Sequence, residues 1–153
     1  SDLEALKAYK EAETIETARK VPAFTWGYAY AGKGAYNEAA EYYRKAADLF
    51  GGDKKYSQPL VYLLVTYAKI PEKKNEARAI LTRIEAMGGY TSPALLAAVY
   101  SALGDNNKAM ALLDQAYLTR DPLLRYVGTG YEYDGLSADP RFVVLKKKLG
   151  FNR

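Results

Sequence analysis

The chain has 153 residues but contains no cysteine and no histidine. Without cysteine it can form neither a disulfide nor a thiolate metal site, although this absence leaves the cellular compartment open. Without histidine it lacks the commonest general base and the commonest zinc ligand, which excludes a histidine-dependent catalytic triad. The composition therefore predicts no metal and no other cofactor.

The chain also lacks a long apolar run and a local concentration of charge. No stretch of about 18 apolar residues is present, so we expect no membrane-spanning segment. The formal net charge is +4, but the lysines are scattered, whereas a nucleic-acid-binding protein usually gathers its cations on one face. We therefore expect no nucleic-acid partner, and the rest of the composition is ordinary for a soluble globular chain.

Tyrosine is unusually abundant, with 15 copies against one tryptophan and four phenylalanines. Its side chain combines a large apolar body with a hydroxyl that needs a partner or water. The tyrosines can fill core positions between helices, or they can line a recognition surface. We favour the core interpretation for most of them.

Glycine and proline divide the sequence into segments of helical composition, and no segment shows the alternation of a half-buried strand. The predicted helices cover residues 2–19, 22–32, 37–50, 57–70, 72–87, 93–103, 106–119, 122–127 and 140–149. Ser92, Asp121 and Asp139 each precede a proline at a predicted helix start, where an oxygen-bearing side chain caps free N–H groups. The sequence therefore predicts an all-α protein.

One pattern of small and large residues recurs along the chain, in which an alanine is followed by a bulky residue four positions later and a small or apolar one seven positions later. The copies are Ala5-Tyr9-Ala12, Ala39-Tyr43-Ala46, Ala77-Leu81-Ile84 and Ala109-Leu113-Ala116. A helix with a small or apolar residue and a tyrosine three positions later precedes each of the last three copies, and these pairs are Gly27 and Tyr30, Leu64 and Tyr67, and Ala97 and Tyr100. This recurrence predicts stacked helical hairpins, because small side chains let neighbouring helices approach closely.

The pattern resembles the tetratricopeptide repeat (TPR), in which W-x2-L-G-x2-Y is followed by A-x3-F and a proline. Residues 23–50 are the best copy, and the resemblance extends over residues 3–117, although every copy lacks the closing proline at its expected place. The resemblance implies a right-handed superhelix of antiparallel helix hairpins, that is, a TPR-like α-solenoid.

The expected organisation is a single TPR-like domain over residues 1–153. Its parts are an N-terminal helix (2–19), three repeats (22–50, 57–87 and 91–119) and a C-terminal cap (120–153).

The C-terminal tail has a second resemblance, carried by Leu136 and the run Asp139-Pro140-Arg141-Phe142. In this it is similar to the ends of repeat regions in some bacterial regulators and signalling proteins. The resemblance implies that the last helix covers the open end of the array. Because the leading repeat lacks its first helix, we also expect the chain to be a piece of a longer protein.

The TPR resemblance implies a concave groove in which side chains at fixed positions of the first helices contact a peptide. The corresponding residues are Val21, Phe24, Tyr28, Ala31, Gln58, Val61, Val65, Lys69, Thr91, Ala94, Ala98 and Ser101. The cationic clamp that holds acidic chaperone tails is missing, since Phe24, Tyr28 and Val61 stand at such positions. We therefore predict a non-catalytic scaffold that binds a peptide or helical segment of a protein partner.

Two alternatives to an open groove remain at this point. In the first, the chain itself partly fills the groove through the segment around Tyr131 and Tyr133. In the second, the chain forms a homodimer and serves as a self-associating structural or sensory module of a larger regulatory protein.

The tail also holds four carboxylates, namely Asp121, Glu132, Asp134 and Asp139. Paired carboxylates can perform acid–base catalysis. Asp121 and Asp139, however, precede prolines at helix starts, so capping accounts for them. The run Gly128-Thr129-Gly130 is too short for a phosphate-binding loop. We therefore expect no enzymatic activity.

Overall fold

The computed structural model describes residues 3–5, 20–49, 57–87 and 91–151, and the side chains of residues 20–22 are not included in that description. Its helices are α2 (Lys20–Gly32), α3 (Tyr36–Leu49), α4 (Gln58–Ala68), η2 (Pro71–Lys73), α5 (Lys74–Ala86), α6 (Pro93–Ala102), α7 (Asn106–Leu118), η3 (Pro122–Tyr126), η4 (Tyr131–Leu136) and α8 (Pro140–Lys148). The described residues contain no strand, which confirms the prediction of an all-α protein. The predicted helix 2–19 lies outside the described residues except for residues 3–5, which are helical.

Within the described residues, the predicted helix boundaries agree with the structure to within two residues. The segment predicted from residue 72 begins with the 3-10 turn η2 at Pro71, a position where the missing N–H of proline removes no helical hydrogen bond. The short helix at 122–127 is the 3-10 helix η3, which ends at Tyr126 just before Gly128. The 3-10 helix η4 has no counterpart among the predictions.

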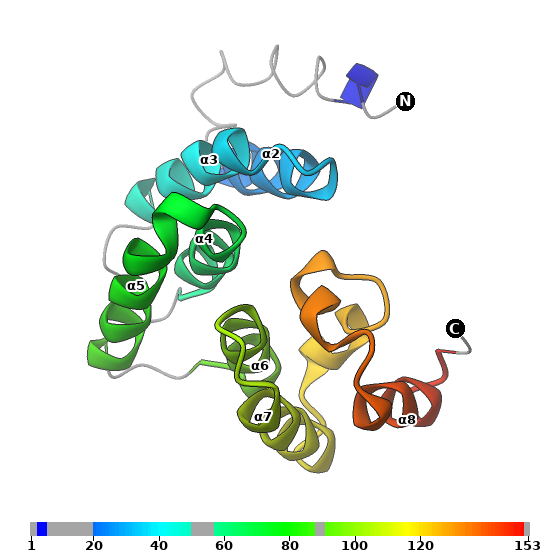
Figure 1. Ribbon diagram of the computed structural model, residues 1–153. Coiled ribbons are helices and arrows are strands. Elements are labelled where there is room, and N and C mark those ends of the chain that lie inside the picture. The colour runs from blue at the N-terminus through cyan, green and yellow to red at the C-terminus, as the bar shows by residue number, and fades with distance from the viewer. Residues whose placement is uncertain (1–2, 6–19, 50–56, 88–90, 152–153) are drawn as a thin grey trace.

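The helices form three neighbouring pairs that follow one another along the chain: α2 with α3, α4 with α5, and α6 with α7 (Figure 1). The pairs are also joined to each other, since α3 packs against α4 and α4 packs against α6. The two short helices η3 and η4 contact α6, and α8 follows them at the C-terminal end (Figure 1). The tail therefore adds to the face of α6 that α7 leaves free.

The recurring alanines are buried between the helices. Ala39, Ala77 and Ala109 are each completely buried. On the preceding helix, Gly27 faces Tyr43 so closely that an added Cβ would lie 2.8 Å from the tyrosine ring. At the seam between α2 and α3 a small residue thus makes room for a large one, as the sequence pattern predicts.

Buried apolar side chains form two groups. The first spans α2 to α6 and includes Tyr43 and Leu64, both fully buried. The second spans α4, α6, α7 and the tail and includes Leu113, Leu136 and Phe142. Since Leu136 and Phe142 belong to the tail, the C-terminal segment is part of the core of the protein.

The three predicted N-caps are confirmed, and one of them does more than cap. Asp121 Oδ1 accepts a hydrogen bond from the backbone N–H of Leu123 at 3.0 Å. Its other oxygen, Oδ2, accepts from the Ser92 hydroxyl and from the backbone N–H of Ala94, the latter at 3.2 Å. Asp121 therefore fastens the start of η3 to the start of α6.

Replacing Asp121 by alanine is expected to lower the free energy of unfolding by about 2 kcal/mol, because it removes a cap and leaves the Ser92 hydroxyl and a buried N–H unpaired. The matched control is Asp105→Ala, which removes an exposed cap bonded to the N–H of Lys108 at 3.0 Å and should cost about 1 kcal/mol. Urea unfolding measures both losses. Equal losses would contradict the bridging role of Asp121.

Candidate functional site

The residues predicted to line a peptide groove are largely covered. The buried members of this set are Ala31, Val61, Val65, Ala94, Ala98 and Ser101. Phe24 and Thr91 are half-buried, whereas Tyr28, Gln58 and Lys69 are exposed. The side chain of Val21 lies outside the described part of the chain. A ligand can therefore reach only part of the predicted groove directly.

Part of this cover is the chain's own helix η4, which lies against α6. The Tyr133 hydroxyl donates a hydrogen bond to the Ala94 carbonyl at 2.9 Å. The hydroxyls of Tyr131 and Tyr43 are hydrogen-bonded at 2.7 Å. The segment around Tyr131 and Tyr133 thus contacts α6 through Ala94 and α3 through Tyr43.

An aromatic cluster lies where η4 meets the N-terminal pairs. It consists of the rings of Phe24, Tyr28, Tyr43, Tyr62 and Tyr131. The Tyr62 ring is central, with centroid distances of 4.9 Å to Phe24 and 5.6 Å to Tyr43. Burial, with a smaller contribution from nearby carboxylates, raises the pKa of Tyr28 to about 12. The Tyr28 hydroxyl is therefore neutral at physiological pH, while the hydroxyls of Tyr43, Tyr62 and Tyr131 each take part in a hydrogen bond.

Glu132 brings a carboxylate into this apolar region and is only 4% exposed. Its Oε1 accepts a hydrogen bond from the Tyr62 hydroxyl at 2.7 Å. Burial raises the pKa of Glu132, and the hydrogen bond from Tyr62 opposes this shift. Its second oxygen, Oε2, is buried and has no hydrogen-bond partner within the described residues. Glu132 is therefore a fixed acceptor with one oxygen unused.

A pocket of about 220 Å³ lies between α4, α6 and η4, and we call it the η4 pocket. Its lining includes Val65, Lys69, Ser101, Tyr131, Glu132 and Gly135. Three of these, Val65, Lys69 and Ser101, belong to the set predicted from the TPR register. The first alternative had placed the segment around Tyr131 and Tyr133 in the groove, but the sequence did not indicate that Glu132 and Gly135 form the opposite wall of a pocket there.

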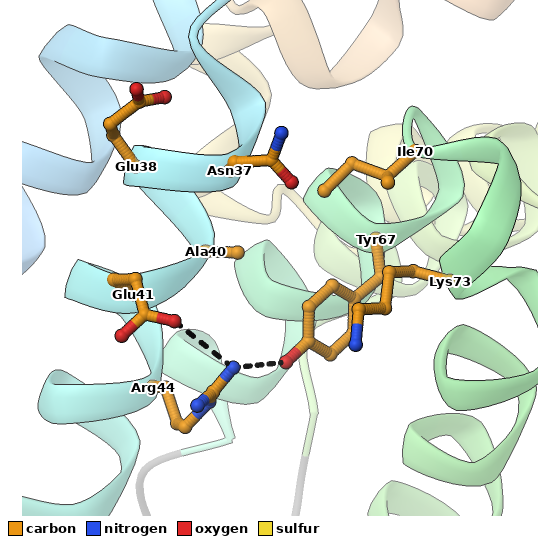
Figure 2. A pocket seen from close by; sticks show the side chains of 8 residues that line it. All are labelled: Asn37, Glu38, Ala40, Glu41, Arg44, Tyr67, Ile70 and Lys73. Carbon is orange, nitrogen blue, oxygen red and sulfur yellow. Dashed lines mark hydrogen bonds and ion pairs between the residues drawn. The ribbon is translucent and has the colours of Figure 1, made fainter.

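A second pocket, of about 290 Å³, lies between α3, α4 and η2 (Figure 2). At its side Arg44 Nη2 donates to the Tyr67 hydroxyl at 3.1 Å and lies 3.3 Å from Glu41 Oε1. A pocket at the corresponding junction one pair later is lined by Ala77 and Leu103. Both pockets lie at junctions between successive helix pairs. The charged side chains that line the first pocket are exposed to solvent or already paired with other residues. Neither pocket is therefore as well suited to hold a ligand as the η4 pocket.

The four tail carboxylates have different environments. Asp121 and Asp139 act as helix caps, and Asp139 also forms an ion pair with Arg141 at 2.7 Å. Asp134 is exposed, whereas Glu132 is buried. Within the described residues no group of three or more potential ligands is arranged to hold a metal ion.

Across the described residues, no helix combines the length and the apolar character that crossing a membrane requires. Comparisons with protein-family models, with curated proteins and with solved structures give no match to this chain.

The raised pKa of Glu132 predicts a pH dependence of stability. The folded chain binds the Glu132 proton more tightly than the unfolded chain does, so the folded state loses stability as the pH rises from the ordinary value near 4.5 through the raised pKa. Glu132→Gln keeps an acceptor for Tyr62 but cannot ionise. The difference in unfolding free energy between the variant and the unmodified chain should therefore grow in favour of the variant across this window.

Urea unfolding of both proteins at a series of pH values from about 4 to about 8 measures this difference. The other titratable groups contribute to both curves and cancel. A difference that stays constant with pH would contradict the raised pKa.

Proposed function

We propose that the chain is a non-catalytic protein-interaction module that binds a peptide segment at the η4 pocket. In this proposal the helix pairs form a TPR-like right-handed superhelix, and the tail narrows its concave groove to a single opening. Support for the repeat architecture comes from the equivalent buried alanines Ala39, Ala77 and Ala109 and from the contacts that link successive pairs.

One observation carries the proposal. An open pocket lies along the predicted groove. Its lining includes three residues of the predicted set, namely Val65, Lys69 and Ser101. The other predicted groove residues include Tyr28 and Gln58, which are exposed, and Phe24 and Thr91, which are half-buried, whereas the rest of those with described side chains are buried. A ligand that follows the groove therefore meets the exposed ring of Tyr28 and then a pocket whose lining combines apolar side chains with a few polar groups, as ligand pockets commonly do.

A selection from a random-peptide display library on the immobilised chain tests the proposal. We expect enriched peptides that bind with micromolar affinity and that bind at least about tenfold more weakly to Lys69→Trp, which places a bulky side chain at the mouth of the pocket. Lys147→Trp is the matched control, because Lys147 is exposed on α8, and should bind as the unmodified chain does. The absence of enriched peptides, or equal binding to both variants, would contradict the proposal.

Self-association is the second candidate function. It is favoured by large apolar side chains that stay exposed on the C-terminal helices, with Leu118 81% and Val144 52% exposed. Light scattering at micromolar concentration tests it, with a dimer expected for the unmodified chain and a monomer for a Leu118→Lys, Val144→Lys variant. A monomeric unmodified chain would contradict this candidate.

A further inference from the structure

Two residues that line the η4 pocket each carry a buried polar atom that has no hydrogen-bond partner among the described residues. These atoms are Glu132 Oε2 and Ser101 Oγ, and the two residues are 4% and 6% exposed. Buried polar groups in folded proteins are almost always hydrogen-bonded, so two unused ones at one pocket indicate a ligand that supplies donors. We propose that the η4 pocket binds a basic side chain, lysine or arginine, of a peptide, with Glu132 as the acceptor.

The carboxylate is held in a defined position before any ligand arrives. The Tyr62 hydroxyl bonds Oε1 at 2.7 Å, which leaves Oε2 as the unused oxygen. Gly130 makes room for the carboxylate, since a Cβ at this position would lie 2.5 Å from Oε2. A preorganised acceptor binds a ligand with a smaller loss of conformational entropy than a mobile one.

The charge of the site selects a cation. An ionised carboxylate accepts hydrogen bonds and donates none, and its strongest bonds are to cationic donors. Asp134 adds negative charge close to Glu132. Lys69 also lines the pocket, but its side chain is exposed on a flexible stem, so it can turn toward solvent and leave Glu132 Oε2 to the ligand.

The size of the pocket suits one long side chain. Its volume of about 220 Å³ is below the range of roughly 300–1,000 Å³ that is typical of pockets for whole small molecules. Val65 and the ring of Tyr131 provide apolar walls for the methylene stem of a lysine or arginine. Ser101 Oγ can accept a second hydrogen bond from the ammonium or guanidinium group.

This inference rests on the proposed peptide-binding function, but the chemistry of the pocket can be measured without a peptide. The probes are n-butylammonium and n-propylguanidinium, which reproduce the ends of lysine and arginine, with n-butanol as the neutral control and butyrate as the anionic control. We expect saturable amide chemical-shift changes at Ser101 and Gly135 with a Kd on the order of 1 mM for both cations. The two controls should give shifts that do not saturate in this range.

Variants separate the role of the carboxylate from a general effect on the fold. Glu132→Gln keeps an acceptor for the Tyr62 hydroxyl and should weaken n-butylammonium binding by at least about tenfold. Ser101→Ala should weaken it by about threefold, and Lys69→Ala should leave it equal or stronger. Glu38→Gln is the control, because Glu38 is an exposed acid that does not line this pocket. Equal binding to Glu132→Gln, or no saturable shift in the unmodified chain, would overturn the inference.

The peptide selection described above distinguishes this inference from the proposed function. Peptides that need a lysine or arginine for binding, and that bind more weakly to Lys69→Trp, support both the inference and the proposed function. Such peptides without any basic residue would overturn the inference and leave the proposed function standing. Saturable n-butylammonium binding without any enriched peptide would support the cation pocket and count against the peptide-binding function.

Discussion

Replacing Gly27 by valine is expected to lower the free energy of unfolding by about 3 kcal/mol, because a side chain at this position overlaps the ring of Tyr43. A Cβ at Gly27 would lie 2.8 Å from two carbons of that ring and 3.0 Å from a third. The two methyl groups of valine add further overlap. Urea unfolding followed by far-UV circular dichroism measures the loss.

Tyr43 has little freedom to move out of the way. Its side chain is fully buried, and its hydroxyl is hydrogen-bonded to that of Tyr131 at 2.7 Å. The rings of Phe24 and Tyr62 pack against it at centroid distances of 5.4 Å and 5.6 Å. Relief of the overlap therefore requires α2 to move away from α3, which opens the seam between the two helices.

Gly32→Ala is the matched control in the same helix. A Cβ at Gly32 would meet no atom within 4 Å. Since alanine favours the helix over glycine, this variant should be as stable as the unmodified chain or up to about 1 kcal/mol more stable. A similar loss in both variants would mean that the close approach of Gly27 and Tyr43 does not determine the stability of this pair.

The helical part of the fold could be predicted because its determinants are local. The alanines at positions 39, 77 and 109 recur within helices whose ends are marked by glycine, proline and capping side chains. Such signals act over a few residues, so the sequence predicts both the helices and the buried seams between them. The buried positions of Ala39, Ala77 and Ala109 agree with that prediction.

The site could be predicted only in part, because its second wall is built from distant contacts. Val65, Lys69 and Ser101 follow from the repeat register, whereas η4 is a short 3-10 helix without a periodic apolar pattern. Glu132 meets Tyr62 across 70 residues of chain, and Tyr133 meets Ala94 across 39. Gly130 precedes this Tyr-Glu-Tyr run and Gly135 follows it closely. The sequence made the run a candidate for filling the groove, but no local signal specifies which helices it contacts.

Docking of η4 is tested by Leu136→Ala, which is expected to lower the free energy of unfolding by about 3 to 4 kcal/mol. Leu136 is fully buried and belongs to the same apolar group as Leu113 and Phe142. Its truncation leaves a cavity between the tail and the pair α6–α7, which the surrounding helices can fill only in part. Urea unfolding measures the loss.

Leu118→Ala removes the same atoms from a side chain that is 81% exposed, so this control should change stability by no more than about 0.5 kcal/mol. In Leu136→Ala, we also expect faster amide hydrogen exchange at Tyr133 and Gly135, because η4 loses its apolar anchor while α2 to α5 keep theirs. If Leu136→Ala behaves like Leu118→Ala in both measurements, η4 is not docked on α6. In that case the wall that holds Glu132 is absent, and the η4 pocket cannot be the binding site.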